Sequence, residues 1–329
     1  MSNRGRILFI NYHYIRDPEA YPYPGIHPLS PAAFRRQIEQ LAEAYRFATP
    51  MDVEMLLDGV PPDEPLVMPT FDDGLVDNLA AIRDVLDPLG AKAAIFVCSR
   101  PLEDAQALAV HKVHWLRATT PPAQFREELV QALPKPLDLD HVAPAVRERA
   151  AAMYIYDTPA DGLLKFLINF VLSHDAVDAA TSAMLAARDI DEAAFARDLY
   201  MDEKTLATLQ ANGHLIGAHG HTHQPFSRME RDALDVELVR SSACIERACG
   251  QRPTWVSYPY GRDWALPEDP EGLCQRHGFR LGITLLEGWN DGSVSPARLR
   301  RYNANEIDAG RHRSDTADAP AASLSNGRA

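Results

Sequence analysis

The chain has 329 residues, of which 46% are hydrophobic and 24% charged, and its formal net charge is −13. This length suffices for one large domain with a buried core, and the composition is typical of a globular protein. The negative charge argues against a nucleic-acid partner, because phosphate binding needs a basic face. The four cysteines show no metal-binding spacing, so we expect reduced thiols and no disulfide framework.

Targeting signals are missing from the sequence pattern. Asn11 and His13 interrupt the N-terminal apolar run 7–10, which is too short for a secretory signal peptide. The longest apolar stretch, 163–172, is shorter than the roughly 20 residues needed to span a bilayer, and it is more typical of a core helix than of a lipid contact. We therefore expect no transmembrane segment and a cytoplasmic protein.

Short apolar strands alternate with amphipathic helices along most of the chain. Ser30 is expected to cap the helix that follows the first strand. Ser227 and Glu230 form a capping-box pattern that predicts the start of a later helix, which Gly250 ends. The expected strands cover residues 6–12, 66–71, 93–98, 214–218, 254–258 and 280–286. This alternation predicts a parallel α/β architecture, either a barrel or an open sheet.

The alternation stops between about residues 100 and 200. Helical patterns there cover residues 122–133, 144–154, 162–172 and 176–187, without a strand pattern. We interpret this segment as a helical insertion in a single barrel domain that spans residues 1–308. Residues 309–329 are rich in Ala, Ser, Asp, Gly and Arg, and we expect a disordered tail.

Two clusters of reactive residues follow expected strands. Asp72 and Asp73 end the second strand, and two adjacent anions are costly unless a cation or a proton shares them; taken alone, the pair also fits a surface turn. His219, His221 and His223 follow the fourth strand. Histidines four apart can face the same way, and a carboxylate with two imidazoles is a common site for a divalent metal. Reactive residues at strand ends favour the barrel over the open sheet.

The fifth expected strand ends in the turn Pro259-Tyr260-Gly261. Such a turn can leave backbone N–H groups exposed, and these donors can form an oxyanion hole. The same tripeptide is also compatible with an ordinary turn.

In this order, the three motifs resemble those of the polysaccharide deacetylase family (carbohydrate esterase family 4, NodB homology) over residues 6–98 and 200–305. The resemblance implies a distorted parallel (β/α) barrel and a metal-dependent carbohydrate N-deacetylase. It also implies Asp72 as the general base, the backbone N–H of Tyr260 as the oxyanion donor, and a metal held by Asp73, His219 and His223. Zinc is the first expectation for this ligand set, with cobalt, nickel or iron as alternatives.

Two departures from the family pattern concern catalysis. Ser257 replaces the family arginine of the third motif, and Arg262 is a candidate substitute. The family histidine that serves as general acid is missing from residues 298–303. A closed barrel has no fixed first strand, so His13 at the end of the first strand can supply this acid. In this respect the chain resembles the permuted branch that contains poly-N-acetylglucosamine deacetylases. The alternative for His13 is a structural role in the barrel.

Four other histidines have weaker patterns. His221 lies between the expected ligands and is the next candidate for the acid if His13 is not. His111 and His114 are interpreted as structural or substrate-lining, and His277 as a helix end.

The expected substrate follows from the expected compartment. A cytoplasmic deacetylase meets intermediates rather than finished polymer, so we expect an amino sugar on a nucleotide or lipid carrier in surface polysaccharide synthesis. Two alternatives stay open: deformylation or cyclic-amide hydrolysis on the same scaffold, and a non-catalytic carbohydrate-binding relic.

Overall fold

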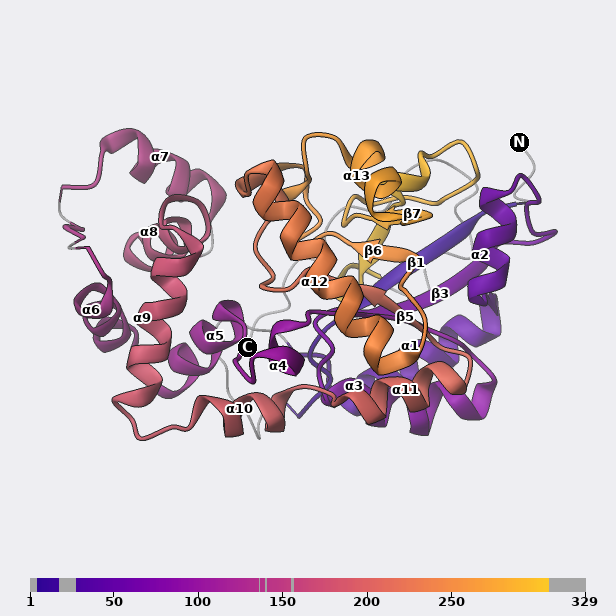
Figure 1. Cartoon of the computed structure of the whole chain (residues 1–329), viewed down its shortest axis with the longest axis horizontal. Helices are drawn as coiled ribbons and strands as arrows, with labels where there is room; N and C mark the ends of the chain where they lie inside the picture. The colour runs from indigo at the N-terminus through magenta and orange to yellow at the C-terminus, as the bar shows by residue number, and fades with distance from the viewer. Residues whose placement is uncertain (1–4, 18–27, 136, 140, 155–156, 308–329) are drawn as a thin grey trace. The chain divides into compact units, whose positions relative to one another are not determined.

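The computed structural model describes residues 5–17, 28–135, 137–139, 141–154 and 157–307, with only the backbone of Glu306 (Figure 1). The expected disordered tail, 309–329, lies outside the described residues. The described residues form two compact units. We call them the barrel unit (residues 5–17, 28–104 and 197–307) and the helical unit (residues 105–196).

Parallel strands form the sheet of the barrel unit, in the order β7-β6-β5-β4-β3-β1-β8, and the short β2 pairs with β3. The strands are β1 (Ile7–Tyr12), β2 (Arg46–Phe47), β3 (Leu66–Phe71), β4 (Ala94–Val97), β5 (Leu215–Ala218), β6 (Trp255–Ser257), β7 (Leu281–Ile283) and β8 (Arg301–Asn303). A parallel bridge between Ile283 of β7 and Leu299, two residues before β8, brings the two ends of the sheet together. The sheet is therefore a nearly closed, distorted (β/α) barrel, which confirms the predicted fold class.

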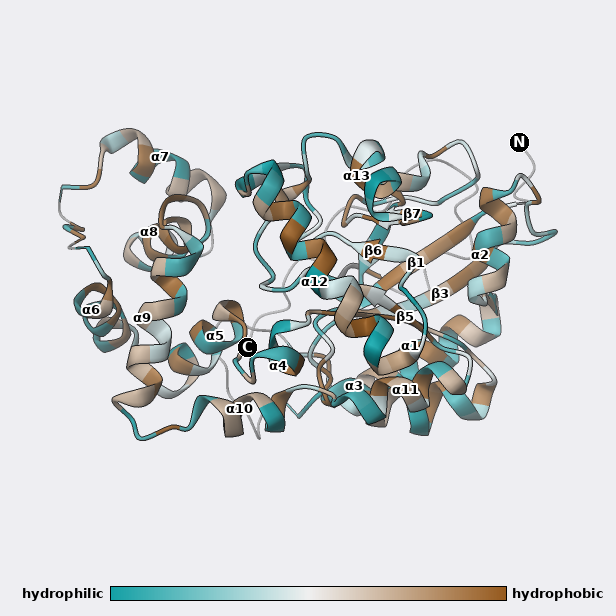
Figure 2. Ribbon diagram, in the orientation of Figure 1, coloured by the Kyte–Doolittle hydropathy of each residue, from teal (hydrophilic) through white to brown (hydrophobic). Residues whose placement is uncertain are grey.

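The strands β1 and β3 are buried along their whole length, and Figure 2 shows both as hydrophobic ribbons. Along β1, Ile7 and Phe9 pack with Trp255 in a cluster drawn from several strands, which is the barrel interior. The alternate residues Leu8 and Ile10 belong to a second cluster, which also contains residues of the surrounding helices such as Phe34. Because both faces are covered, the two strands are mostly apolar rather than alternating, and Asn11 and Thr70 are their polar residues.

Helices surround the barrel, and three of the expected helix ends are confirmed. The hydroxyl of Ser30 accepts a hydrogen bond from the Ala33 N–H at the start of the first helix, Gly250 ends another with φ +77°, and His277 ends a third. The helices are α1 (Pro31–Ala44), α2 (Pro50–Leu57), α3 (Asp77–Ala81), α4 (Arg100–Glu103), α11 (Glu203–Ala211), α12 (Arg231–Cys249) and α13 (Pro270–His277).

The predicted capping box at Ser227 is wrong. The helix α12 begins at Arg231 and has no side-chain cap, and Ser227 lies in a preceding 3-10 turn. The Ser227 hydroxyl donates instead to the carbonyl of Trp264, at 2.7 Å. The Ser227 hydroxyl therefore forms a tertiary hydrogen bond with Trp264 in place of the helix cap that the local pattern predicted.

The helical unit has an apolar core of its own. Its helices are α5 (Ala109–Thr119), α6 (Pro122–Ala132), α7 (Pro144–Met153), α8 (Pro159–Phe166) and α9 (His174–Ala186); α10 (Glu192–Leu199) begins here and ends in the barrel unit. No strand occurs among its described residues. The apolar stretch 163–172 contributes buried side chains to this core, namely Leu163, Leu164, Phe166 and Leu167.

Two further observations concern the chain as a whole. All four cysteines are free thiols. In the part of the chain that the structure describes, no helix is both long and apolar enough to cross a membrane.

Candidate active site

The candidate residues lie at the carboxyl ends of neighbouring strands in the barrel. Asp72 and Asp73 follow β3 directly, His219 follows β5, and His13 follows β1. Because β1 lies beside β3, and β4 separates β3 from β5, all four residues belong to one sector of the same barrel end. This is the end at which (β/α) barrels place reactive groups.

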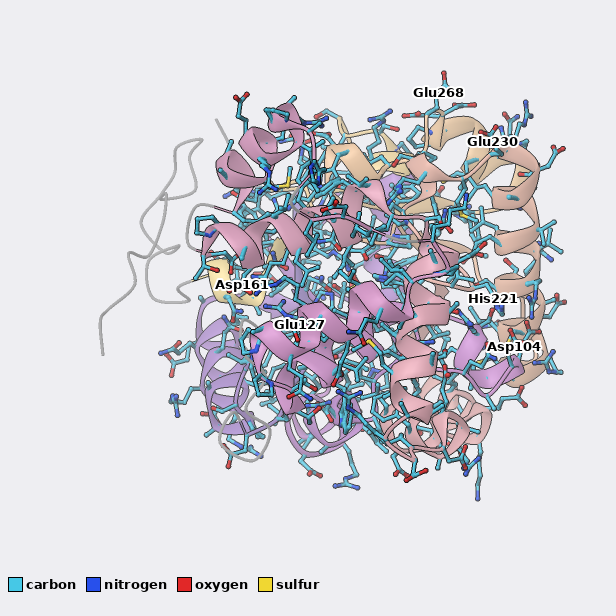
Figure 3. The ribbon with its side chains drawn as sticks, turned by 90° about the vertical axis from the view of Figure 1, so that its left-hand side faces the viewer. Asp104, Glu127, Asp161, His221, Glu230 and Glu268 are labelled. Carbon is cyan, nitrogen blue, oxygen red and sulfur yellow. The ribbon has the colours of Figure 1, made fainter. Side chains whose placement is uncertain are left out.

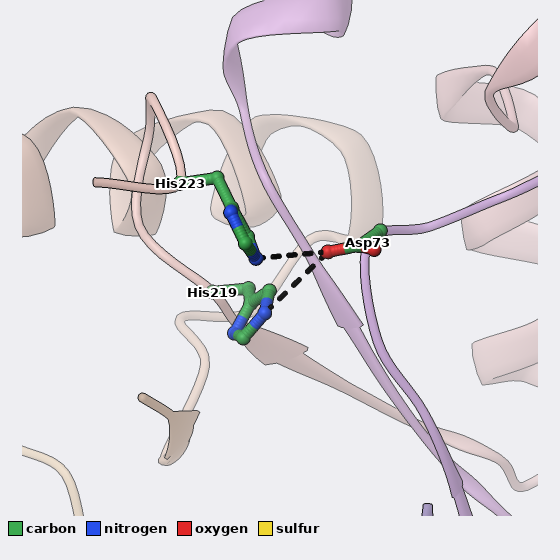
Figure 4. Close-up of side chains that lie close together, drawn as sticks. All are labelled: Asp73, His219 and His223. Atoms are coloured by element: carbon green, nitrogen blue, oxygen red, sulfur yellow. Dashed lines mark ion pairs between the residues drawn. The ribbon is translucent and has the colours of Figure 1, made fainter. Parts of the chain in front are cut away.

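A buried carboxylate and two buried imidazoles converge at this end (Figure 4). Asp73 Oδ1 lies 3.5 Å from His219 Nε2 and 3.3 Å from His223 Nε2. The nearest ligand atoms of the three side chains all lie within 4.8 Å of one another, and all three residues are buried. This donor set, one carboxylate oxygen and two ring nitrogens, is typical of sites for zinc and similar divalent ions.

The hydrogen bonds of His219 leave its inner nitrogen suited to a metal. Its Nδ1 lies 2.7 Å from the carbonyl oxygen of Ser257 and must donate, because a carbonyl only accepts. The neutral ring then carries a lone pair on Nε2, which is buried and has no hydrogen-bond partner among the described residues. Metal-binding histidines usually donate their other N–H to a carbonyl or carboxylate in this way. His219 therefore fits a ligand role, together with Asp73 and His223.

The backbone at two of these positions adopts the left-handed conformation. Asp73 has φ +72°, Gly74 has φ +69°, and His223 has φ +63°. Such values cost a non-glycine residue about 1–3 kcal/mol and cluster at functional sites.

The interpretation of the Asp-Asp-Gly segment as a surface turn is wrong, because Asp72 and Asp73 are only 3% and 4% exposed.

The partner of Asp72 is an arginine that the sequence did not indicate. Arg301 of β8 donates two hydrogen bonds to the Asp72 carboxylate, one to each oxygen and both 2.8 Å long. Ser257 lies against the same pair, 3.0 Å from the Arg301 guanidinium and 3.4 Å from Asp72. Burial tends to raise the pKa of Asp72, but the charge and hydrogen bonds of Arg301 hold that pKa below its usual value. Asp72 is therefore an ionised, oriented carboxylate at neutral pH.

Arg301 is the positively charged neighbour of Asp72, which the sequence left unassigned because Ser257 replaces the family arginine. The sequence pattern suggested Arg262 for this position, whereas the guanidinium that holds Asp72 comes from β8. The sequence shows three arginines within residues 298–303, Arg298, Arg300 and Arg301, but only the structure shows that Arg301 lies in a strand beside β1 and pairs with Asp72.

His13 lies near the same charges. Its backbone carbonyl accepts a hydrogen bond of 2.6 Å from the side chain of Asn78. Burial lowers the pKa of the His13 ring; the charges of Asp73 and Asp72 raise that pKa less than burial lowers it, and the charge of Arg301 lowers it further. The barrel thus brings an imidazole from β1 to the Asp72 and Asp73 site, while its role as general acid stays a prediction.

Tyr260 also reaches the candidate ligands. Its ring centroid lies 5.0 Å from that of His223, and its backbone has φ +64°. The following residue, Gly261, accepts a hydrogen bond from the Leu285 N–H at 2.7 Å, which fixes the turn against the segment after β7. The turn after β6 is therefore at the site, and the oxyanion role of the Tyr260 N–H stays a prediction.

His221 is engaged away from the cluster. Its ring pairs through Nδ1 with the Ser99 hydroxyl at 2.8 Å and through Nε2 with Asp104 at 3.0 Å, and Figure 3 shows His221 beside Asp104. Both ring nitrogens thus have partners on the β4–α4 side, which disfavours His221 as the alternative acid. His111 and His114 lie in α5 of the helical unit, with ring centroids 6.0 Å apart.

Several solved structures share this fold. The chain resembles a Streptococcus pyogenes deacetylase, PplD, whose structure is a complex with acetate (TM-score 0.57, 16% identity, covering 91% of this chain and 92% of that one). It also resembles IcaB from Ammonifex degensii (0.56, 14%, 91% and 92%) and a de-N-acetylase from Aggregatibacter actinomycetemcomitans (0.52, 14%, 90% and 94%). Comparison with curated protein sequences gives no match.

The fold and the site together define a (β/α)-barrel protein with a carboxylate–imidazole cluster at the carboxyl end of its strands. The family model for polysaccharide deacetylase matches residues 169–281, a segment that contains His219, His223 and the turn at Tyr260. Over this segment, which is less than half of the chain, the protein is similar to the polysaccharide deacetylase family.

Proposed function

We propose that this protein is a metal-dependent hydrolase that removes the N-acetyl group from an amino sugar. One observation carries the proposal: a three-residue cluster suited to a divalent metal lies next to a buried carboxylate that Arg301 keeps ionised. A deacetylase needs both a Lewis acid for the amide and a base for water. The similarity to polysaccharide deacetylases suggests the class of reaction, and the cluster with Asp72 supplies the groups that such a reaction needs.

Asp73, His219 and His223 would hold the metal ion. A bound divalent ion supplies a Lewis acid and lowers the pKa of water toward neutrality. Zinc is our first choice for a site with one carboxylate and two imidazoles, and cobalt, nickel or iron suit the same donors.

The remaining steps use side chains and backbone groups of the chain itself. Asp72 takes the proton of the attacking water, and Arg301 fixes the orientation and charge of that base. The backbone N–H of Tyr260 donates to the negative oxygen that develops on the amide carbonyl. His13 donates a proton to the nitrogen that leaves as an amine. Because burial lowers the pKa of His13, we expect activity to decline as the pH rises through a value on the acid side of 6.5.

The substrate we propose is an N-acetyl amino sugar linked to a nucleotide or lipid carrier, an intermediate of surface polysaccharide synthesis in the cytoplasm. The acetate in the Streptococcus pyogenes deacetylase structure supports acetyl as the group removed. The carrier is inferred from the expected compartment alone.

The test is product release from a defined panel. Purified protein is incubated with nucleotide-linked, lipid-linked and oligomeric N-acetyl amino sugars, together with N-formyl analogues, and acetate and formate are measured separately. We expect acetate from a carrier-linked sugar and none after chelation of the metal. Acetate only from oligomers would contradict the carrier, formate would favour a deformylase, and binding without release would favour the relic.

A further inference from the structure

The loop that carries the two candidate ligand histidines rests on one buried carboxylate. Glu237 of α12 is 4% exposed. Its Oε1 accepts hydrogen bonds from the His221 N–H at 2.8 Å, the Thr222 N–H at 2.6 Å and the Thr222 hydroxyl at 2.9 Å. All three donors lie between His219 and His223 in the chain. A single side-chain oxygen thus holds the middle of the loop.

The two bonded N–H groups belong to consecutive residues. Successive N–H groups that converge on one point form a concave site for an anionic oxygen. Hydrogen bonds to a carboxylate are also stronger than neutral ones, and a buried carboxylate without donors is costly. Glu237 and the loop therefore satisfy each other, and an apolar side chain here leaves the buried His221 N–H and the part-buried Thr222 N–H without their acceptor.

The conformation of the loop explains why it needs such a support. Gly220 has φ +78° and His223 has φ +63°, so the chain enters the left-handed region on both sides of the two N–H groups that Glu237 binds. A Cβ on Gly220 would lie 3.0 Å from Glu237 Oε1 and 3.2 Å from the ring of Phe226, which shows how closely the loop packs on α12. A backbone with a strained histidine persists only where its surroundings hold it.

We propose that Glu237 is a positioning residue that sets the metal affinity of this protein by holding the His219–His223 loop in its ligating conformation. The inference rests on the proposed function, because it assumes that these histidines bind a metal. Glu237 itself is not a ligand. Its effect is transmitted through the backbone of His221 and Thr222 to the histidines on either side.

Variants that change either the length or the charge of the Glu237 side chain distinguish a positioning role from an electrostatic one. Glu237→Gln keeps the length and an oxygen that can accept the same three hydrogen bonds, but it removes the charge. Glu237→Asp keeps the charge but withdraws the oxygen by about one carbon–carbon bond. Positioning predicts that Gln preserves metal binding and that Asp weakens it. A purely electrostatic role predicts the opposite order.

The experiment measures zinc dissociation constants of the full chain by competition with a chromophoric chelator, and the absorption spectrum of the cobalt-substituted protein. We expect Glu237→Asp and Glu237→Ala to weaken zinc about 10–100-fold, the usual effect of losing a group that orients ligands, and to alter the cobalt spectrum. Glu237→Gln should stay within a few-fold of wild type. Glu246→Ala, on the exposed face of the same helix, is the matched control and should not change either readout.

The outcomes distinguish this inference from the proposed function. If wild type binds zinc and Glu237→Asp binds it equally well, or if Glu237→Gln is the weaker variant, the positioning role is wrong. If the wild type binds no zinc, or if the His223→Ala variant binds zinc as tightly as the wild type does, the assignment of the metal site is wrong instead. Urea unfolding of each metal-free variant identifies any that fail to fold. If Glu237→Ala does not fold, the comparison of Glu237→Asp with Glu237→Gln still tests the positioning role.

Discussion

Replacing Arg301 by methionine tests the electrostatic core of the site. The side chains of Arg301 and Asp72 are only 1% and 4% exposed, and their pair is closed by two hydrogen bonds of 2.8 Å. Methionine fills much of the volume of the arginine stem without its charge. Arg301→Met therefore leaves the Asp72 carboxylate buried with the Ser257 hydroxyl and no cation from β8.

The expected cost is large because it is the cost of an uncompensated buried charge. Breaking a buried ion pair by removing one partner destabilises proteins by about 3–5 kcal/mol, whereas replacing both partners is often close to neutral. We expect Arg301→Met to lower the free energy of unfolding by about that amount at pH 7. The double variant Arg301→Met/Asp72→Asn should recover most of the loss.

The pH dependence has a definite sign. In the wild type, the pKa of Asp72 lies below its unfolded value, so this group stabilises the fold above the unfolded pKa and the contribution is lost as the pH falls through the folded pKa. Without Arg301, burial dominates and the pKa of Asp72 rises. The variant should therefore become less destabilised as the pH falls through that raised value. Its residual activity should also lose its base at a higher pH than wild type does.

The measurement is urea unfolding between pH 4 and 8, with Arg300→Met at the neighbouring exposed position as the control. Initial rates of acetate release over the same range locate the acid limb of the activity profile. A loss below about 1 kcal/mol, or a double variant no more stable than Arg301→Met alone, would refute the assignment of Arg301 as the charge partner of Asp72.

Two further predictions concern histidines. His13→Ala should lower turnover about 10²–10⁴-fold with near-normal metal content, because it removes a general acid and no ligand; normal turnover, or loss of metal, would show that the acid lies elsewhere. His214 is buried; its ring accepts a hydrogen bond from the Ala93 N–H and pairs with Asp87 at 3.0 Å. Burial lowers the pKa of His214 more than Asp87 raises it. Its contribution to stability is therefore present above about pH 6.5 and is lost as the pH falls through the lower folded pKa. His214→Asn, which keeps an acceptor for Ala93, should flatten the fall in unfolding free energy between pH 7 and 5, whereas the exposed control His141→Asn should leave that slope unchanged.

The parts of the fold that the sequence predicted are those with strong local patterns. The strand β3 runs from Leu66 to Phe71, as its largely apolar run predicted, and Ser30 caps α1. The two-residue strand β2 has too little pattern to be recognised. The capping box at Ser227 failed because its hydroxyl bonds to a residue 37 positions away, which a local pattern does not contain.

The candidate site divides in the same way. Asp73, His219 and His223 could be predicted because a strand end followed by a ligand motif is a local signal. Arg301 could not, because it reaches Asp72 across 229 residues once the barrel has closed. Glu237 lies on a helix beyond the motif, and only the folded loop shows that its carboxylate accepts three of the loop's donors.

We propose that Asp73, His219 and His223 hold the metal that deacetylation needs. The most direct measurement is elemental analysis of wild-type protein and the His223→Ala variant, with acetate release from the active substrate measured on the same samples. We predict about one equivalent of a divalent metal in the wild type, and loss of most of the metal and of acetate release together in the variant. Full metal occupancy in His223→Ala, or acetate release by wild-type protein stripped of metal, would contradict the claim.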